Sequence, residues 1–205
     1  MEKQLSTLIA KVSLSMFRKN FFGVYHGAIS AKIDRDKFLI NRNDAIFDEM
    51  DENSLMELHH KKDYRWKDAS IDAPIHSNIY QKFSDAKYIA YSMPPYATAY
   101  ASRYSKIYPE DYFGYRNLGE ISVYNPRTFE DWYERADVEI PRRLRDSKKN
   151  FLLIRGYGLY VFERDINTLA KTTALVENSC RILYLSKALE KRSVVNSVDD
   201  GIYLM

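Results

Sequence analysis

The chain has 205 residues, 29% of them charged, and a formal net charge of +3; these values fit one soluble globular domain. With 45% hydrophobic residues the composition excludes a disordered chain, and the mild charge disfavours a nucleic-acid-binding domain. No signal peptide or membrane-length apolar stretch is recognisable, so a cytoplasmic location is expected. The single cysteine, Cys180, lies in an apolar helical pattern and is predicted to be a buried, inert thiol.

The first part of the chain predicts a helix, a hairpin, a strand and a second helix. Apolar residues at helical spacing predict an amphipathic helix over residues 1–19. A hairpin over residues 25–41 turns at Asp-Arg-Asp, and residues 45–47 are expected to be extended. Asp51 is expected to cap a short turn before a strand at 55–58. Residues 59–70 look irregular, and Asp72 followed by Pro74 predicts the start of a helix.

The second part alternates strands with helices. A strand at 88–91 meets two prolines and then a helix over 94–103, whereas the aromatic-rich residues 105–118 predict a long loop. A helix that contains Pro141 is expected over 128–145, and a final helix is expected to be capped by Asp165. Further strands are expected at 120–123, 151–154 and 159–162.

These elements predict an α/β fold of three layers, in which helices flank a central mixed, mainly antiparallel sheet. One domain is expected over residues 1–192, followed by a loose polar tail over 193–205 whose last residues, 202–205, are candidates for docking on a partner. A basic run around Arg142 and Arg143 is interpreted as a solvated helix face.

The stretch from Ile89 to Tyr100 resembles the class II aldolase/adducin family segment that reads His-x-His-x-Pro-Tyr-Ala-Thr-Ala, because Pro95-Tyr96-Ala97-Thr98-Ala99 matches its second half. Four further signatures follow the family order, and the resemblance covers about residues 5–189. They are Gly27-Ala28-Ile29-Ser30, Phe38-Leu39-Ile40 before a polar turn, Asp72-x-x-x-His76 with Ile79-Tyr80, and Gly156-Tyr157-Gly158 followed by Arg164-Asp165. The resemblance therefore implies the family fold.

In the family, three histidines hold a divalent metal, usually zinc, which polarises a ketose carbonyl, and a nearby Glu moves protons. The resemblance places the three histidines at Tyr91, Met93 and Tyr157, and the Glu at Asp72. Phenols and a thioether are poor zinc ligands, so no metal cofactor is predicted. A site rebuilt from other histidines is disfavoured; the candidates are His26, His59 and His60.

The positions that the resemblance assigns to the sugar phosphate are altered too. Ala28 and Ile71 offer no side-chain donor, and Asp44 adds a negative charge. At about 4 Å and a surface-like dielectric, that charge would repel a phosphate by roughly 4 kcal/mol. Lys32 and Arg42 are close enough in sequence to offset it. The retained candidate substrate-binding residues are Gly27, Ser30, Asn43 and Ser70.

Two functions stay open. The first is a non-catalytic binding or assembly module, as in the adducin head, built as a homo-oligomer, with a tetramer favoured. The second is an aldehyde-lyase or isomerase that acts on a sugar or sugar phosphate by metal-free or altered-metal carbonyl chemistry. Its candidate catalytic residues are Asp72, Tyr91, Tyr157 and His76.

Each candidate also has a structural interpretation. The two phenols would fill the vacated pocket, Met93 would pack, Asp72 would cap its helix, and His76 would be a satisfied helix residue. Five aromatic residues mark either a subunit interface or the core: Tyr64, Trp66, Tyr112, Phe113 and Trp132. No nucleic-acid or membrane partner is expected, and a small carbonyl or sugar ligand is left open.

Overall fold

The computed structural model describes residues 2–199, with side chains for residues 3–189. In this part of the chain, eight strands form one sheet in the order β3-β2-β1-β4-β8-β7-β6-β5. Only β6 and β7 run parallel among the described pairs, which confirms the predicted mixed, mainly antiparallel sheet. The strands are β1 (Ala28–Lys32), β2 (Lys37–Asn41), β3 (Leu55–His59), β4 (Tyr88–Ser92), β5 (Lys106–Ile107), β6 (Ile121–Tyr124), β7 (Phe151–Ile154) and β8 (Gly158–Glu163).

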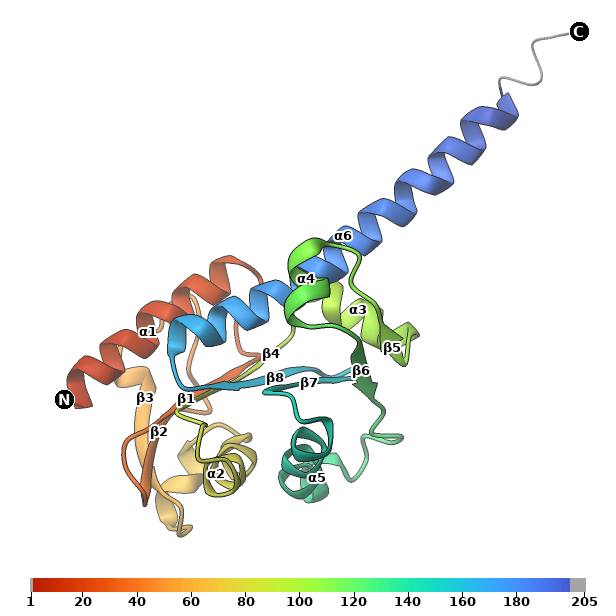
Figure 1. Cartoon of the computed structure of the whole chain (residues 1–205). Coiled ribbons are helices and arrows are strands. Elements are labelled where there is room, and N and C mark those ends of the chain that lie inside the picture. Colours follow the sequence, from red (N-terminus) through yellow and green to blue (C-terminus); the bar gives the residue numbers. More distant parts are fainter. Residues whose placement is uncertain (1, 200–205) are drawn as a thin grey trace, which may run out of the picture.

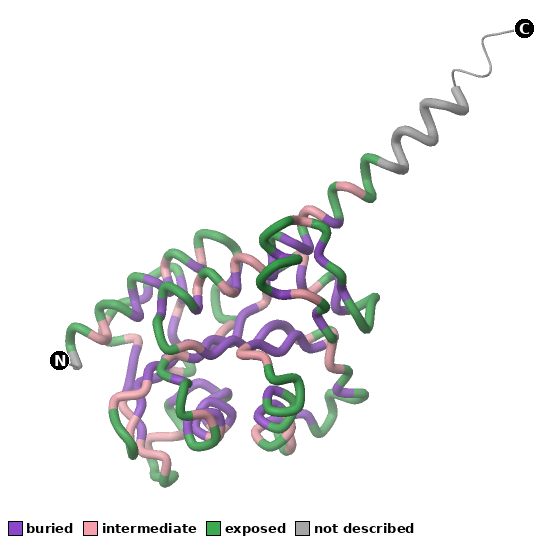
Figure 2. Tube along the Cα trace, in the orientation of Figure 1, coloured by how far each residue is buried: buried purple, intermediate pink, exposed green. Residues whose placement is uncertain are grey.

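Helices cover both faces of the sheet (Figure 1). One face carries α2 (Ala73–Lys82) and α5 (Trp132–Ser147). The other carries α1 (Glu2–Arg18), α3 (Pro95–Arg103), α4 (Tyr112–Asn117) and α6 (Ile166–Asp199). Figure 2 shows that burial is concentrated in the sheet and on the inward sides of these helices.

Alternation along the strands divides the apolar residues between two cores. In β4, Ala90 belongs to the core under α1, α3 and α6, whereas Ile89 and Tyr91 belong to the core under α2 and α5. Trp132 is 2% exposed in this second core. The core interpretation of Trp132 is therefore correct, and it is not a surface interface residue.

The segment at 105–118 is not the long loop predicted from the sequence. It contains the short strand β5 and the helix α4, whose N-terminus is capped by the Asp111 carboxylate accepting from the Gly114 N–H at 2.8 Å. Gly114 lies against α6 so closely that an added Cβ would sit 2.2 Å from Ser179 Oγ. Elements this short show little periodicity, so tertiary packing decides them.

Two smaller predictions also need correction. Residues 45–47, expected to be extended, belong to no strand: residues 45 and 46 have no regular structure, and the fully buried Phe47 begins a turn. The polar stretch at 59–70 contains a 3-10 helix, η2 (Tyr64–Asp68), capped by Asp63. The capped turn before β3 is confirmed, because Asp51 and Ser54 form a capping box around η1 (Glu52–Ser54).

The last helix, α6, passes α3 and α4 and continues beyond them (Figure 1). Its described length reaches Asp199, so helix replaces the loose tail expected from residue 193 to that point. Residues 200–205, including the proposed docking segment at 202–205, lie outside the described residues. None of the described helices has both the length and the hydropathy needed to cross a bilayer.

Candidate functional site

The site forms around a carboxylate at the start of α2. Asp72 is the residue before the first turn, as predicted, but its side chain makes no cap hydrogen bond. The carboxylate turns toward the sheet instead. There Oδ1 accepts a short hydrogen bond from the Tyr160 hydroxyl and a longer one, 3.3 Å, from the Tyr157 hydroxyl. Asp72 is 2% exposed, so the expected helix cap is replaced by a buried, phenol-bound carboxylate.

Stacked tyrosine rings cover this carboxylate. The Tyr91 ring lies 4.6 Å from Tyr157 and 5.0 Å from Tyr160, both in stacked orientation. β4 and β8 place Tyr91 directly opposite Tyr160 in the antiparallel register, which explains their contact. The Tyr91 hydroxyl donates to the Tyr157 backbone carbonyl at 2.9 Å. Asp72, Tyr91 and Tyr157 are therefore brought together, as predicted from the family resemblance.

Hydrogen-bonded tyrosine hydroxyls connect Asp72 to the protein surface at α5. The Tyr157 hydroxyl lies 2.9 Å from the Tyr133 hydroxyl, and the Tyr133 side chain is 47% exposed. Trp132, one residue earlier, packs edge-on against the Tyr157 ring at 5.3 Å. The arrangement connects a buried acid to solvent through two phenols.

Burial shifts the acidities of these groups in one direction. Desolvation raises the pKa of Asp72 from 3.8 to about 6, although hydrogen bonds from Tyr160 and Tyr157 lower it in part. Burial, followed by the nearby Asp72 charge, raises the pKa of Tyr91 and of Tyr157 well above the ordinary phenol value. Both phenols therefore stay protonated at neutral pH.

His76, the fourth candidate catalytic residue, serves a different network. Its Nδ1 lies 2.7 Å from Ser30 Oγ, which in turn lies 2.7 Å from the Tyr80 hydroxyl. The His76 ring meets the edge of Tyr160 at 6.1 Å, and its buried Nε2 has no hydrogen-bond partner among the described residues. Burial lowers the pKa of His76 from 6.5 to about 3, so the ring is neutral.

The predicted substrate-binding residues make different hydrogen bonds within the fold. Ser30 is fully buried and bound to His76 and Tyr80, and Ser70 Oγ accepts from the Asp72 N–H at 3.3 Å. Asn43 is exposed and donates from its side chain to the Lys67 carbonyl at 3.2 Å.

Gly27, the remaining candidate substrate-binding residue, has φ +147° and lies against Phe22. The two cations expected to offset Asp44 are engaged elsewhere. Lys32 donates to the Tyr80 carbonyl at 3.2 Å, and Arg42 donates to the Asn53 carbonyl at 3.1 Å.

The donors at the family's metal positions do not fit zinc. Asp72 supplies the one carboxylate there and is occupied by two phenols, and Met93 offers a thioether. A phenol binds zinc as phenolate, which the raised pKa of Tyr91 and Tyr157 disfavours. Within the described part of the chain, no three His, Cys, Asp or Glu side chains are grouped so that they could hold a metal ion.

Two residues of the site, Tyr133 and Tyr160, were not predicted from the sequence. Tyr160 belongs to an apolar strand pattern, where a tyrosine is indistinguishable from a core residue. Residues 158, 160 and 162 share one face of a strand, and the spacing of three residues between Tyr157 and Tyr160 does not predict that the two phenols meet. The sequence pattern did not indicate Tyr133 as a site residue, because it predicts a helix start at residue 128, whereas the helix begins at Trp132.

The fold and this pocket define a class of α/β proteins with a central mixed sheet and a polar site between β4, β8 and α2. The sequence profile of the Class II Aldolase and Adducin N-terminal domain matches residues 7–184. The chain therefore belongs to the class II aldolase/adducin family.

Solved structures with the same fold are distant in sequence. L-fuculose-1-phosphate aldolase from Thermus thermophilus superposes with a TM-score of 0.81 at 21% identity, over 92% of this chain and 96% of that one. YgbL, a putative aldolase/epimerase/decarboxylase from Escherichia coli, gives a TM-score of 0.74 at 14% identity, over 90% of each chain. A sugar-phosphate aldolase from Thermotoga maritima gives 0.69 at 16% identity, over 89% of this chain and 94% of its own. No curated protein sequence matches the chain.

Proposed function

We propose that this chain is a class II aldolase/adducin-family domain with a degenerate metal site, and that it acts as a binding or assembly module and not as a zinc-dependent aldolase. One observation supports this most directly. The Asp72 carboxylate, at a family site position, is buried and hydrogen-bonded to Tyr160 and Tyr157. A Lewis acid placed there would have to break those bonds and deprotonate a buried phenol.

Zinc binding tests this proposal. Purified native chain, incubated with zinc and then dialysed, is expected to retain well under one equivalent by elemental analysis and to show no zinc-dependent rise in melting temperature. A variant with Tyr91→His, Met93→His and Tyr157→His restores the family's donor types and is the positive control. One tightly bound equivalent in the native chain that is lost in Asp72→Asn would overturn the proposal.

We also propose that the chain forms a homo-oligomer, with a tetramer favoured. The exposed rings on α4 support this, because Tyr112 and Phe113 are each 66% exposed and Tyr115 is 75% exposed. Light scattering is expected to give a multiple of the 24.1 kDa chain mass, and Phe113→Asp is expected to lower it. A monomer at micromolar concentration would contradict this part. The cytoplasmic location stays a prediction.

A second candidate function is metal-free proton transfer on a carbonyl or sugar substrate. It is favoured by one observation: Asp72, with a pKa raised to about 6, is connected through Tyr157 to the half-exposed Tyr133. A carboxyl group with a pKa near neutrality suits general acid–base chemistry. Turnover of a sugar phosphate that falls at least tenfold in Tyr133→Phe, with folding intact, would establish this candidate; absence of turnover in the native chain would remove it.

A further inference from the structure

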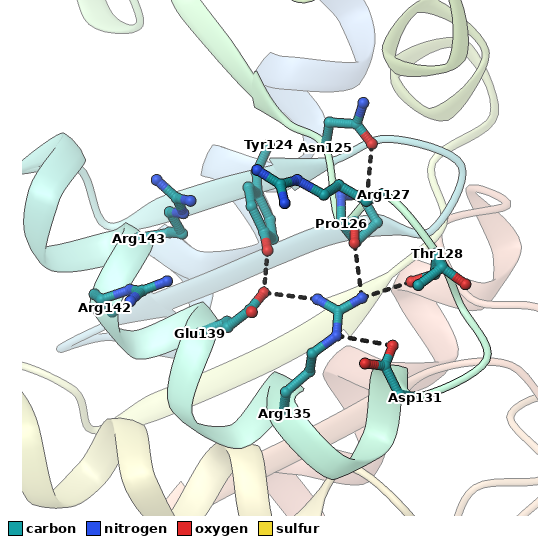
Figure 3. Close-up of a pocket in the computed structure, with 10 residues that line it drawn as sticks. All are labelled: Tyr124, Asn125, Pro126, Arg127, Thr128, Asp131, Arg135, Glu139, Arg142 and Arg143. Carbon is teal, nitrogen blue, oxygen red and sulfur yellow. Dashed lines mark hydrogen bonds and ion pairs between the residues drawn. The ribbon is translucent and has the colours of Figure 1, made fainter.

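Arg142 and Arg143 of the basic run are exposed on α5, as expected for a solvated helix face, and they also line a pocket. A cavity of about 410 Å³ lies between the end of β6, the loop at 125–131 and one side of α5. Figure 3 shows Arg127 entering from the loop, and Arg142 and Arg143 from α5, with the Tyr124 ring between them. A volume of this size is typical of small-molecule sites.

A single arginine, Arg135, forms ion pairs with both carboxylates of this pocket. Arg135 Nε binds Asp131 at 3.0 Å, and its Nη1 binds Glu139 at 2.9 Å. The Tyr124 hydroxyl also donates to Glu139. Four arginines against two carboxylates leave the pocket with a net charge of +2.

The other three guanidinium groups are not committed to acids. Among the described side chains, no carboxylate lies within ion-pair distance of Arg127, Arg142 or Arg143. Arg143 stacks over the Tyr124 ring at 4.8 Å, which orients its guanidinium without neutralising it. Uncommitted, planar guanidiniums are suited to bidentate binding of phosphate oxygens.

The loop that presents Arg127 is held in an unfavourable conformation. Arg127 has φ +70°, in the left-handed region, and its N–H donates to Asn125 Oδ1 at 2.9 Å. Arg135 holds the same loop by donating from Nη2 to the carbonyls of Pro126 and Thr128, at 2.7 and 2.6 Å. Backbone strain that is maintained in this way is found mostly at binding and catalytic sites.

From these observations we infer that this pocket binds a small, multiply charged anion of the phosphate-ester class. A neighbouring hollow of about 500 Å³ shares Tyr124, Asn125, Arg127 and Arg143, and adds Lys149. It gives room for the organic part of such a ligand. Its Lys149 ammonium donates to the carbonyls of Leu118 and Glu120 and is balanced in charge by Asp146, so the arginines supply the positive charge of the site. The residues that line this pocket are not those of the Asp72 site. The Trp132 ring lies between the two, in contact with Tyr157 of one and with Tyr124 and Arg135 of the other.

Calorimetric titration with pyrophosphate, using the full chain, tests the inference. Native protein is expected to bind one equivalent per chain, and Arg127→Gln and Arg143→Gln are each expected to weaken binding about tenfold, because each removes a charge-assisted hydrogen bond. Arg145→Gln is the matched control, since it removes an exposed arginine of the same helix outside this pocket. Its affinity is expected to stay within about twofold.

Three outcomes would overturn the inference. Equal weakening by Arg145→Gln would reduce the effect to general surface charge. No saturable binding at low ionic strength would remove the site. Binding of a long single-stranded RNA that pyrophosphate does not displace would assign the basic surface to a polymer. Unfolding midpoints of all variants separate loss of binding from loss of fold.

Discussion

Asp72 and His76 lie one turn apart on α2, and their burial gives opposite pH dependences of stability. The pKa of Asp72 is raised from 3.8 to about 6, so the folded state holds the extra proton and the free energy of unfolding falls as pH rises through that window. The pKa of His76 is lowered from 6.5 to about 3, so its contribution is complete above pH 6.5 and is lost on acidification toward pH 3. Between pH 4 and 6 the two effects largely cancel.

The variant Asp72→Asn is expected to show how His76 changes stability with pH, because the opposing effect of Asp72 is removed. The amide oxygen still accepts from Tyr160, but no charge is buried, so the variant should gain stability relative to the native chain as pH rises from 4 to 7. The gain corresponds to the shift in the pKa of Asp72, on the order of 3 kcal/mol. Urea unfolding at several pH values measures it. A stability difference that does not change with pH would show that the carboxyl group is not perturbed by burial.

At the scale of single residues, the family resemblance implied which side chains meet but not how they are bonded. Asp72, Tyr91 and Tyr157 meet as the family resemblance implied, whereas the cap expected for Asp72 was wrong because two phenols compete for its carboxylate. That competition arises from β8 lying beside α2 and β4, a tertiary arrangement that no local pattern contains. Ser30 is likewise drawn into the core by His76 and Tyr80.

Among the elements, β4 and β8 approach so closely that a side chain at the start of β8 would not fit. Gly158 has φ +144°, and a Cβ at this position would lie 2.4 Å from the Ser92 backbone carbonyl oxygen. The neighbouring pair Ser92 and Leu159 sets the register that brings Tyr91 opposite Tyr160. The geometry of the site therefore depends on this glycine.

Gly158→Ala is expected to destabilise the fold by about 3 kcal/mol or more, because it adds both backbone strain and a collision with rigid backbone. Gly119→Ala is the matched control. Gly119 also has a positive φ, +58°, but an added Cβ would meet no atom within 4 Å, so a cost of about 1 kcal/mol is expected. Chemical denaturation compares the two, and equal costs would refute the close-packing explanation.

The elements that could be predicted share one physical property, which is a clear apolar pattern. α1 has apolar residues at helical spacing, whereas β1, β2, β7 and β8 are mostly apolar runs that are buried over nearly their whole length. The segment at 105–118 failed because β5 and α4 are too short to show a period, and because the packing of Gly114 on α6 fixes α4 in place. The late start of α5 depends on Arg135 holding the preceding loop, which is equally invisible locally.

At the scale of the whole molecule, the prediction that one domain spans residues 1–192 can be tested by shortening the chain. A chain ended after Arg192 is expected to unfold cooperatively within about 2 °C of the full chain, since those residues of α6 that the structure describes as buried all precede that point. A chain ended after Asp165 is the contrasting case. It removes Ile166, Leu169, Val176 and Leu183, whose burial is worth about 6–12 kcal/mol, comparable to the whole stability of a domain.

Thermal unfolding followed by circular dichroism distinguishes these cases. The longer chain should show one sharp transition and the shorter chain none. A shortened chain of 192 residues that lost its transition would place residues 193–199 within the folding unit. That outcome would replace the predicted boundary with one near the end of α6.

The order of the strands in the sheet also affects how the chain folds during its synthesis. β8 fills the gap between β4 and β7, although roughly seventy residues of chain separate Ser92 from Glu163. At 5–20 residues per second, a ribosome needs about 4 to 14 s to deliver that stretch. Throughout this delay β4 presents an unpaired, apolar edge, the kind of surface that invites another chain to pair with it. Newly synthesised protein is therefore most exposed to aggregation just before its last strand emerges.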